Sequence, residues 1–433
     1  MSALQQSLRE YLDTVPVIET HVHYTSNTEV YADAFPMILG YLKSDLRIAA
    51  GRRGAHVIEY LADASIPFRK RYQVFEPLYE QCRHTSYAKA MVRGLQVCWG
   101  IPDASYASLC LLNERLPERN QDFYRKTMER LHIRAQIADI FESRFFSIVD
   151  GSDTDYTSVS KFAFPLPAFH RLYTYEQLDF VQNLTGRTFV CLDDYVEAVE
   201  ELLQKGADWG MVCIKDQSAY FRSLQYKNPT KAEAEKAFNT LVSQPLHMLG
   251  TEEGAALDDW LFHRFLRKAG KLDLPVQLHT GLQDRICMIQ DRVGSDITAV
   301  NAARLIPVLT QHQDVQFDLF HASWPYLDEI LSIGKNFPNA YIDLCWTHAI
   351  DPLYSIELMK RATMCMPSTR LLGFGGDAFV MENGVGYLEM AKDNIAQALA
   401  ELVECGWLNR REAEALAVDW LYYNPKNLFR LDC

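Results

Sequence analysis

The feature that most constrains the fold of this chain is a series of short apolar runs, each ending in a polar or ionisable residue and separated from the next by a longer helix-like stretch. This alternation predicts parallel strands joined by crossover helices. The clearest runs span residues 16–23, 210–215, 275–281, 315–321, 340–346 and 370–377. We therefore predict an α/β fold in which these runs are strands of a (β/α)8 TIM barrel.

Three stretches qualify this prediction. Residues 24–144 are rich in helix formers and long charged side chains, so we expect a large helical insertion after strand 1. Residues 145–175 contain FFSIVDGSD and KFAFPLPAFHRLY, which could be the second and third strands or an irregular loop. From Val385 an apolar helical face that stops near Gly406 predicts C-terminal helices. No Pro/Gly/Ser linker marks a boundary, so residues 1–433 are expected to form a single, distorted barrel domain.

Charge and composition narrow the classes of function. The 433 residues include 43 Lys and Arg against 56 Asp and Glu, which gives a formal net charge of −13. Nucleic acids and anionic membranes attract clustered positive charge, so neither is an expected partner. Glu10 and Asp13 lie where a signal peptide would be basic and then apolar, and no apolar run is long enough to span a bilayer. The expected location is the cytoplasm.

Histidines and an aspartate lie at the ends of the predicted strands. In VIETHVH, His21 and His23 are two residues apart, so strand geometry points both imidazoles to the same side. Alone, such a pair is more often an ordinary surface feature than a metal site. The carboxyl ends of barrel strands meet on one face, however, and four other runs end in residues that would join the pair there. These residues are Lys215, His279, His321 and Asp377.

This order of residues resembles the amidohydrolase superfamily, whose pattern is H-x-H on strand 1, Lys or Glu on strand 4, His on strands 5 and 6, and Asp on strand 8. All six positions find a match in this chain. The segments KDQSAYFRSL, VQLHTGLQD, FHASWP, PNAYIDLCW and GFGGDA are more narrowly similar to the amidohydrolase-2 branch, which includes uronate isomerase and FluG-type proteins.

The resemblance implies a divalent metal ion at these strand ends. His21, His23 and Asp377 would be ligands, and His279 lies where many relatives place a third imidazole. Asp377 would also take a proton from the water that the metal activates. The alternative for Asp377 is a helix N-cap. Zinc is the expected ion, with manganese or iron as alternatives, and one or two ions are compatible with the pattern.

The remaining candidates would act in catalysis or substrate binding. His321 would hold a second metal or polarise the substrate, and a buried structural histidine is the alternative. Lys215 would bridge two metals as a carboxylated lysine or bind an anionic substrate as an ammonium. Five further side chains could grip a small acid or polyol, with solvated loop, surface salt-bridge and core-packing roles as alternatives. They are Tyr220, Arg222, Arg285, Trp346 and His348.

The expected function is that of a metal-dependent hydrolase which activates water to cleave a C–N or C–O bond in a small, polar, anionic substrate. Uronate-isomerase-like chemistry is the nearest alternative, with nonhydrolytic decarboxylation as a third. A catalytically silent, sugar-acid-binding barrel is the non-enzymatic alternative, and the complete set of ligand residues argues against it. Homo-oligomers are common among such barrels, but nothing in the sequence selects one.

Overall fold

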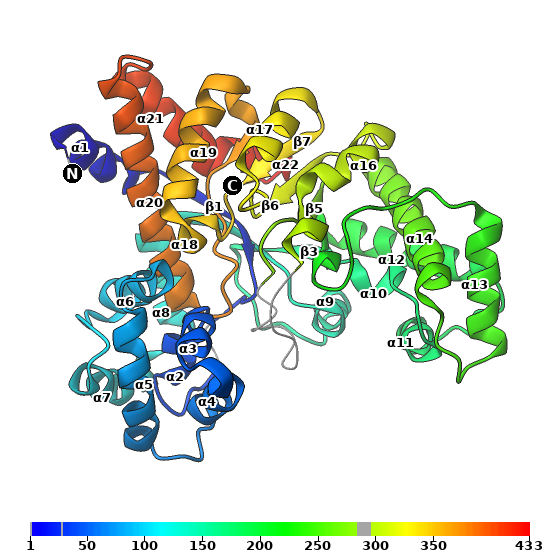
Figure 1. The fold of residues 1–433 in the computed structure, drawn as a ribbon, viewed down its shortest axis with the longest axis horizontal. Helices are drawn as coiled ribbons and strands as arrows, with labels where there is room; N and C mark the ends of the chain where they lie inside the picture. Colours follow the sequence, from blue (N-terminus) through cyan, green and yellow to red (C-terminus); the bar gives the residue numbers. More distant parts are fainter. Residues whose placement is uncertain (1, 27–28, 284–295) are drawn as a thin grey trace.

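This computed structural model of the chain describes residues 2–26, 29–283 and 296–433. Eight parallel strands pair in chain order from first to last, as expected for an α/β barrel (Figure 1). The strands are β1 (Val17–Val22), β2 (Ile133–Ala138), β3 (Ser160–Pro165), β4 (Cys213–Asp216), β5 (Val276–His279), β6 (Phe317–Phe320), β7 (Ala340–Asp343) and β8 (Leu371–Leu372). Nearly every strand residue is buried, because helices cover the outer face of the sheet and side chains fill the inside.

The barrel is nearly closed between its first and last strands. No ladder joins β1 to β8 among the described residues, but backbone hydrogen bonds cross the gap between β1 and the segment after β8. The His23 amide donates to the Ala378 carbonyl at 2.9 Å, and the Asp377 amide donates to the His21 carbonyl at 2.9 Å. The predicted metal ligands therefore lie on both sides of this seam, His21 and His23 on one side and Asp377 on the other.

The helical insertion after β1 is confirmed, but its predicted end is wrong. Its α-helices lie together beside the barrel, at the lower left of Figure 1. They are α2 (Phe35–Leu39), α3 (Leu42–Ala49), α4 (Gly54–Ala62), α5 (Phe68–Cys82), α6 (Ser86–Trp99), α7 (Tyr106–Arg115) and α8 (Gln121–Arg130). The prediction of 24–144 extended too far, because β2 already pairs with β1 from Ile133 onward.

The sequence left the structure of two stretches within residues 145–175 undecided, and these two stretches form different elements. FFSIVDGSD contributes the end of helix α9 (Glu142–Val149), whereas KFAFP forms most of β3. The helices that follow β3 through β7 complete the barrel's outer layer. They are α10 (Pro167–His170), α11 (Tyr175–Thr185), α12 (Leu192–Trp209), α13 (Lys231–Ser243), α14 (Thr251–Leu272), α16 (Ile306–Gln311), α17 (Leu327–Asn336), α18 (Thr347–Ile350) and α19 (Pro352–Cys365).

The expected C-terminal helices are present and connect the barrel to the insertion. They are α20 (Met381–Glu404), α21 (Arg410–Val418) and α22 (Asn424–Leu428), and the N-terminal helix α1 (Ala3–Leu12) packs on α20. Helices α6 and α20 cross almost backbone to backbone: a Cβ on Gly94 would lie 2.0 Å from the Glu382 carbonyl oxygen, and one on Gly386 would lie 2.0 Å from that of Ala90. Only glycine permits this approach. None of the described helices is long and apolar enough to cross a bilayer.

Candidate metal centre

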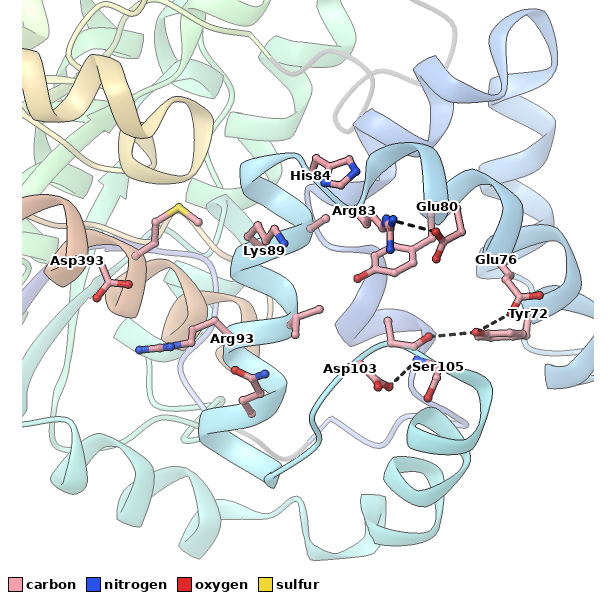
Figure 2. A pocket seen from close by; sticks show the side chains of 16 residues that line it. Tyr72, Glu76, Glu80, Arg83, His84, Lys89, Arg93, Asp103, Ser105 and Asp393 are labelled. Atoms are coloured by element: carbon pink, nitrogen blue, oxygen red, sulfur yellow. Dashed lines mark hydrogen bonds and ion pairs between the residues drawn. The ribbon is translucent and has the colours of Figure 1, made fainter. Parts of the chain in front are cut away.

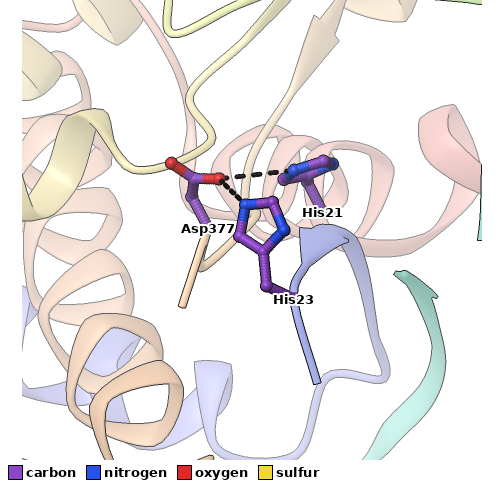
Figure 3. Close-up of side chains that lie close together, drawn as sticks. All are labelled: His21, His23 and Asp377. Atoms are coloured by element: carbon purple, nitrogen blue, oxygen red, sulfur yellow. Dashed lines mark hydrogen bonds and ion pairs between the residues drawn. The ribbon is translucent and has the colours of Figure 1, made fainter. Parts of the chain in front are cut away.

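Three of the predicted ligands converge at the seam of the barrel. His21 lies on β1, His23 follows it, and Asp377 faces both from the segment after β8 (Figure 3). The Asp377 Oδ1 atom lies 3.3 Å from His21 Nε2 and 3.1 Å from His23 Nε2. The candidate ligand atoms of the three residues all lie within 4.8 Å of one another. All three side chains are nearly inaccessible to solvent.

The tautomer of His23 leaves a ring lone pair aimed at Asp377. His23 Nδ1 lies 2.8 Å from the Asp139 carbonyl, which can only accept a hydrogen bond, so Nδ1 is the donor. In the neutral imidazole, Nε2 then has no proton and faces a carboxylate oxygen. Burial lowers the pKa of His23, but the hydrogen bond and charge of Asp377 outweigh it and raise the pKa overall. The Nε2 lone pair and the carboxylate oxygen repel each other. A cation between them, either a proton or a metal ion, removes this repulsion.

The same reasoning applies to His279 and His321. His279 Nε2 lies 2.6 Å from the Leu282 carbonyl and His321 Nδ1 lies 2.9 Å from that of Cys345, so both nitrogens are donors. The other two nitrogens, His279 Nδ1 and His321 Nε2, face each other at 3.2 Å. Burial lowers the pKa of His279 well below its usual value and that of His321 to about 4, so both rings are neutral and both facing nitrogens are lone pairs.

These contacts fit a bound divalent cation. Histidine ligands of metals commonly donate their second N–H to a carbonyl or carboxylate, which fixes the ring and frees the other nitrogen. Three imidazoles here are held in that way. The fourth, His21, is buried and has no hydrogen bond at either nitrogen among the described residues. Burial, and then the charge of His23, lower its pKa well below the usual value, so it is neutral. An unpaired, buried imidazole nitrogen is costly unless a ligand satisfies it.

A tyrosine from the insertion completes the surroundings of Asp377. The Tyr41 hydroxyl, between α2 and α3, donates to Asp377 Oδ2 at 2.8 Å. The Tyr41 ring stacks on Trp346 at 4.5 Å between centroids, which holds the phenol in place. Asp377 therefore has one oxygen toward the histidines and one toward the insertion. Although burial opposes it, the contacts of Asp377 with His23, His321 and His21 lower the pKa of its carboxyl group, which is ionised at neutral pH.

A small cavity lies over these residues. Lys215, at the end of β4, is buried in its wall; its ammonium donates to the Asp216 carbonyl at 3.4 Å and lies 4.6 Å from the centre of the Phe320 ring. Tyr220 also lines the cavity, with its ring 4.7 Å from that of His279. The described lining is His21, His23, Tyr41, Asp139, Phe141, Lys215, Gln217, Tyr220, His279, Asp377 and Phe379.

Comparison with known proteins agrees with the pattern of residues. A sequence profile of the family described as Amidohydrolase matches residues 172–431, more than half of the chain and the part that holds Lys215, His279, His321 and Asp377. The chain belongs to the amidohydrolase family. The superfamily resemblance stated from the sequence is thereby confirmed, and the His, His and Asp cluster could hold a metal ion, as is typical of this superfamily.

The chain also resembles two solved structures in its fold and one longer protein in part of its sequence. The structure of a uronate isomerase from Thermotoga maritima matches with a TM-score of 0.79 and 15% identity over 99% of this chain and 98% of that one. A glucuronate isomerase from Caulobacter crescentus matches with a TM-score of 0.74 and 15% identity over 100% and 94%. At this identity the likeness shows the fold alone. Protein fluG of Emericella nidulans is 28% identical over 238 residues, which is 52% of this chain; the aligned part spans only 26% of fluG.

Three other predicted substrate residues lie outside this described lining. The Arg222 guanidinium pairs with Asp258 at 2.9 Å and Asp259 at 2.5 Å on α14. Trp346 is 1% exposed and supports Tyr41 from behind. His348 has hydrogen-bond partners at both ring nitrogens, the Gly373 carbonyl and the Asn394 amide. Their roles in substrate binding remain predictions. Arg285 lies outside the described residues.

The sequence analysis missed five residues that line the cavity: Tyr41, Asp139, Phe141, Gln217 and Phe379. Asp139 could have been found, because IRAQIAD is another apolar run that ends in a carboxylate. Its side chain is buried and its Oδ2 atom has no hydrogen bond to a described residue. Phe379 lies two residues after Asp377 and stacks on His23. Nothing in the sequence distinguishes Tyr41 from the other tyrosines of the chain.

A larger cavity lies elsewhere among the described residues. It has a volume of about 780 Å³ and lies between the insertion helices α5 and α6 and the C-terminal helix α20 (Figure 2). It shares no residue with the described lining of the metal centre. Several of its polar groups pair with one another: Arg83 with Glu80 at 3.3 Å, and the Tyr72 hydroxyl with Glu76 at 3.4 Å. We therefore assign the chemistry to the smaller cavity, where the unpaired nitrogens are.

Proposed function

We propose that this protein is a metal-dependent hydrolase that activates water to cleave a C–N or C–O bond in a small anionic substrate. The observation that carries this proposal is the set of buried imidazole nitrogens that face one another and an ionised aspartate at one site. Uncompensated, that arrangement is repulsive, and a divalent cation makes it favourable. We propose zinc as the metal, because histidine nitrogens and carboxylate oxygens are among its usual protein ligands.

His21, His23 and Asp377 would hold the ion, with His279 as a further imidazole donor. When bound, the ion would supply Lewis acidity and lower the pKa of a water molecule toward about 7. The chain's own groups then handle the proton and the substrate. Asp377 is an ionised base, and the hydrogen bond from Tyr41 to its Oδ2 orients the carboxylate. A proton that this carboxylate takes up would then pass to the leaving atom.

Lys215 supplies the positive charge in the described wall of the cavity. Burial lowers its pKa, while the charges of Asp139, Asp377 and Asp216 act in the opposite direction. As an ammonium it would orient an anionic group of the substrate. His321 lies between Asp377 and Trp346, with Nε2 3.9 Å from Asp377 Oδ2, where its Nε2 lone pair would be a donor to a second metal ion.

The first test is elemental analysis of protein purified without chelators. About one equivalent of metal per chain supports a single ion at His21, His23 and Asp377, with Lys215 free to bind substrate. About two equivalents would instead support a carboxylated Lys215 that bridges a metal pair. If no metal binds, even after incubation with zinc or manganese, the proposal is wrong.

The second test is a substrate panel. The metal-loaded protein should hydrolyse at least one class of N-acyl amino acids, carboxylate-bearing lactones or esters. The chelated protein and an Asp377→Asn variant serve as matched controls and should be inactive. Equal hydrolysis by all three samples would identify a contaminant or a reaction that does not use this site.

A sugar-acid isomerase is the second candidate. It is favoured by the full-length fold similarity to the Thermotoga maritima uronate isomerase, which includes the insertion. Incubation of the metal-loaded protein with hexuronates should then give ketose products. Product formation from hexuronates together with an inactive hydrolysis panel would favour the isomerase over the hydrolase.

A further inference from the structure

The cavity over the metal residues is too small for a whole substrate. Its volume is about 20 Å³, which is close to the space that one water molecule needs. Only the reacting group of a substrate fits there. The other atoms of the substrate must lie in an adjoining space, and the described lining residues show where one begins.

A second cavity adjoins the first and is much larger, about 270 Å³. Tyr41 and Phe379 line both cavities, so these two side chains form the wall between them. We call this second space the insertion cavity, because residues 36–62 of the insertion form one side and residues 378–387 form the other. Its lining is Pro36, Leu39, Gly40, Tyr41, Lys43, Ile58, Ala62, Ala378, Phe379, Val380, Asn383 and Tyr387.

The dividing wall is aromatic and reaches the metal residues directly. The Phe379 ring stacks on the His23 ring with centroids 4.4 Å apart and planes within 13°. The Tyr41 ring lies 6.3 Å from that of Phe379 and 6.4 Å from that of Tyr387. Phe379 is 37% exposed, although it is a large apolar residue beside buried ligands. An exposed ring in such a position is available to a ligand that passes from one cavity to the other.

The insertion cavity has few polar groups, and some of them already have hydrogen-bond partners. The Asn383 amide donates to the Met37 carbonyl at 2.8 Å, and the Tyr41 hydroxyl donates to Asp377. Lys43 is half-buried in the wall. A hexuronate, which has a hydroxyl group on most of its carbons, would lose hydrogen bonds to water here and regain few. A planar apolar group would instead pack against Tyr41, Phe379 and Tyr387.

We infer that the insertion cavity binds an aryl group of the substrate while the reacting bond lies over His21, His23 and Asp377. A volume of about 270 Å³ exceeds the roughly 150 Å³ cavity that accommodates benzene, so a single ring with a short linker fits. This inference rests on the proposed hydrolase function and specifies its substrate class: small acids whose amide or ester carries an aryl substituent.

Binding of a small fluorinated probe tests the inference without turnover. The probe is 4-fluorobenzyl alcohol, titrated into the metal-free protein and followed by 19F NMR, so that metal coordination cannot cause binding. We expect a Kd in the low-millimolar range or tighter, typical of a fragment of this size. Ile58→Trp, which fills the insertion cavity, should weaken binding at least tenfold. Val57→Trp is the matched control, because Val57 is the half-buried neighbour on α4 that does not line the cavity, and it should leave the Kd unchanged.

Further measurements separate the aryl site from the hydrolase proposal. If Ile58→Trp does not fold, Ala62→Phe at the exposed end of α4 replaces it with the same expected loss of binding. Loading with Mn2+ should shorten the 19F relaxation time of the bound probe, because the two cavities share a wall. Failure of the probe to bind, equal weakening by both tryptophan variants, or bound probe unaffected by bound Mn2+ would overturn the inference. Probe binding without any metal uptake would support the aryl site and overturn the hydrolase.

Discussion

At the scale of single residues, Asp377 connects every part of the candidate site. His21 and His23 face one of its oxygens, and Tyr41 donates to the other. Replacing it by asparagine keeps the shape of the side chain but removes the charge that attracts the cation and the base that carries the proton. We expect Asp377→Asn to lower kcat/KM by about 10² to 10⁴, and to lower the bound metal measured by elemental analysis. Activity equal to that of the unchanged protein would revive a silent binding role.

Tyr41 is predicted to act on the metal through Asp377. A partner that orients a metal-binding carboxylate typically contributes about 10- to 100-fold to metal affinity or activity. Tyr41→Phe should therefore weaken metal binding by about that factor in a calorimetric titration. The free energy of unfolding of the metal-free protein should change by only about 1 kcal/mol, since one hydrogen bond is lost. Tyr31→Phe, elsewhere in the insertion, is the control and should leave metal affinity as it is.

The sequence predicted those site residues whose position depends on local geometry. His21 and His23 share a strand, and Asp377 ends the last apolar run, so strand periodicity and barrel topology together bring them to one place. Tyr41 could not be predicted in this way. Its contact with Asp377 spans 336 positions and depends on how a whole set of insertion helices docks on the barrel, which no local pattern encodes.

At the scale of elements, a buried charged network connects α10, β4 and α14. His170, on α10 directly after β3, lies 2.6 Å from Asp216 at the end of β4 and 2.5 Å from Asp258 on α14. Burial alone would lower the pKa of His170, but the two carboxylates raise it to about 9. The imidazolium therefore connects α10 and α14 to β4, the strand that carries Lys215.

The pH dependence of stability should reveal this network. Because the pKa of His170 is raised from about 6.5 when unfolded to about 9 when folded, its contribution is complete below pH 6.5 and is lost as pH rises through 9. Urea unfolding at several pH values should show that decline, and His170→Gln should abolish it and cost about 3–5 kcal/mol at pH 6. His348→Gln is the control, because burial lowers the pKa of His348 to about 4 and leaves it neutral throughout this range. The same slope in His170→Gln would contradict the assignment.

The sequence did not predict β2 and α9, because in each of them one sequence feature favours a strand and another feature argues against it. In β2 the polar residues Arg134 and Gln136 interrupt the apolar run, and the strand follows the charged helix α8, so the stretch was assigned to the insertion. Gln136 is nevertheless buried, because its amide donates to Glu19 on β1. FFSIV in α9 has the composition of a strand, but three of its residues pack inward at helical spacing: Phe145, Phe146 and Ile148. Tertiary contacts decided both cases.

At the scale of the whole molecule, the candidate metal centre lies where the barrel closes without a strand ladder. Seven pairs of strands are joined by parallel ladders, whereas β1 and the segment after β8 meet through separate hydrogen bonds. His21 and His23 lie on one side of this seam and Asp377 on the other. A cation that binds all three would join the two sides, so ligand binding and closure of the barrel would be linked.

This linkage predicts a local effect of metal removal, which hydrogen exchange can measure. At a free metal concentration about 100 times Kd, binding stabilises the closed state by about 2.7 kcal/mol. Chelation should therefore speed exchange of the seam amides of His23 and Asp377 by up to roughly a hundredfold. The Val276 amide, which donates to the Gln316 carbonyl in the ladder between β5 and β6, is the control and should change little. Uniform acceleration at all three amides would mean that the metal stabilises the whole barrel. No acceleration at the seam would show that the seam stays closed without the ion.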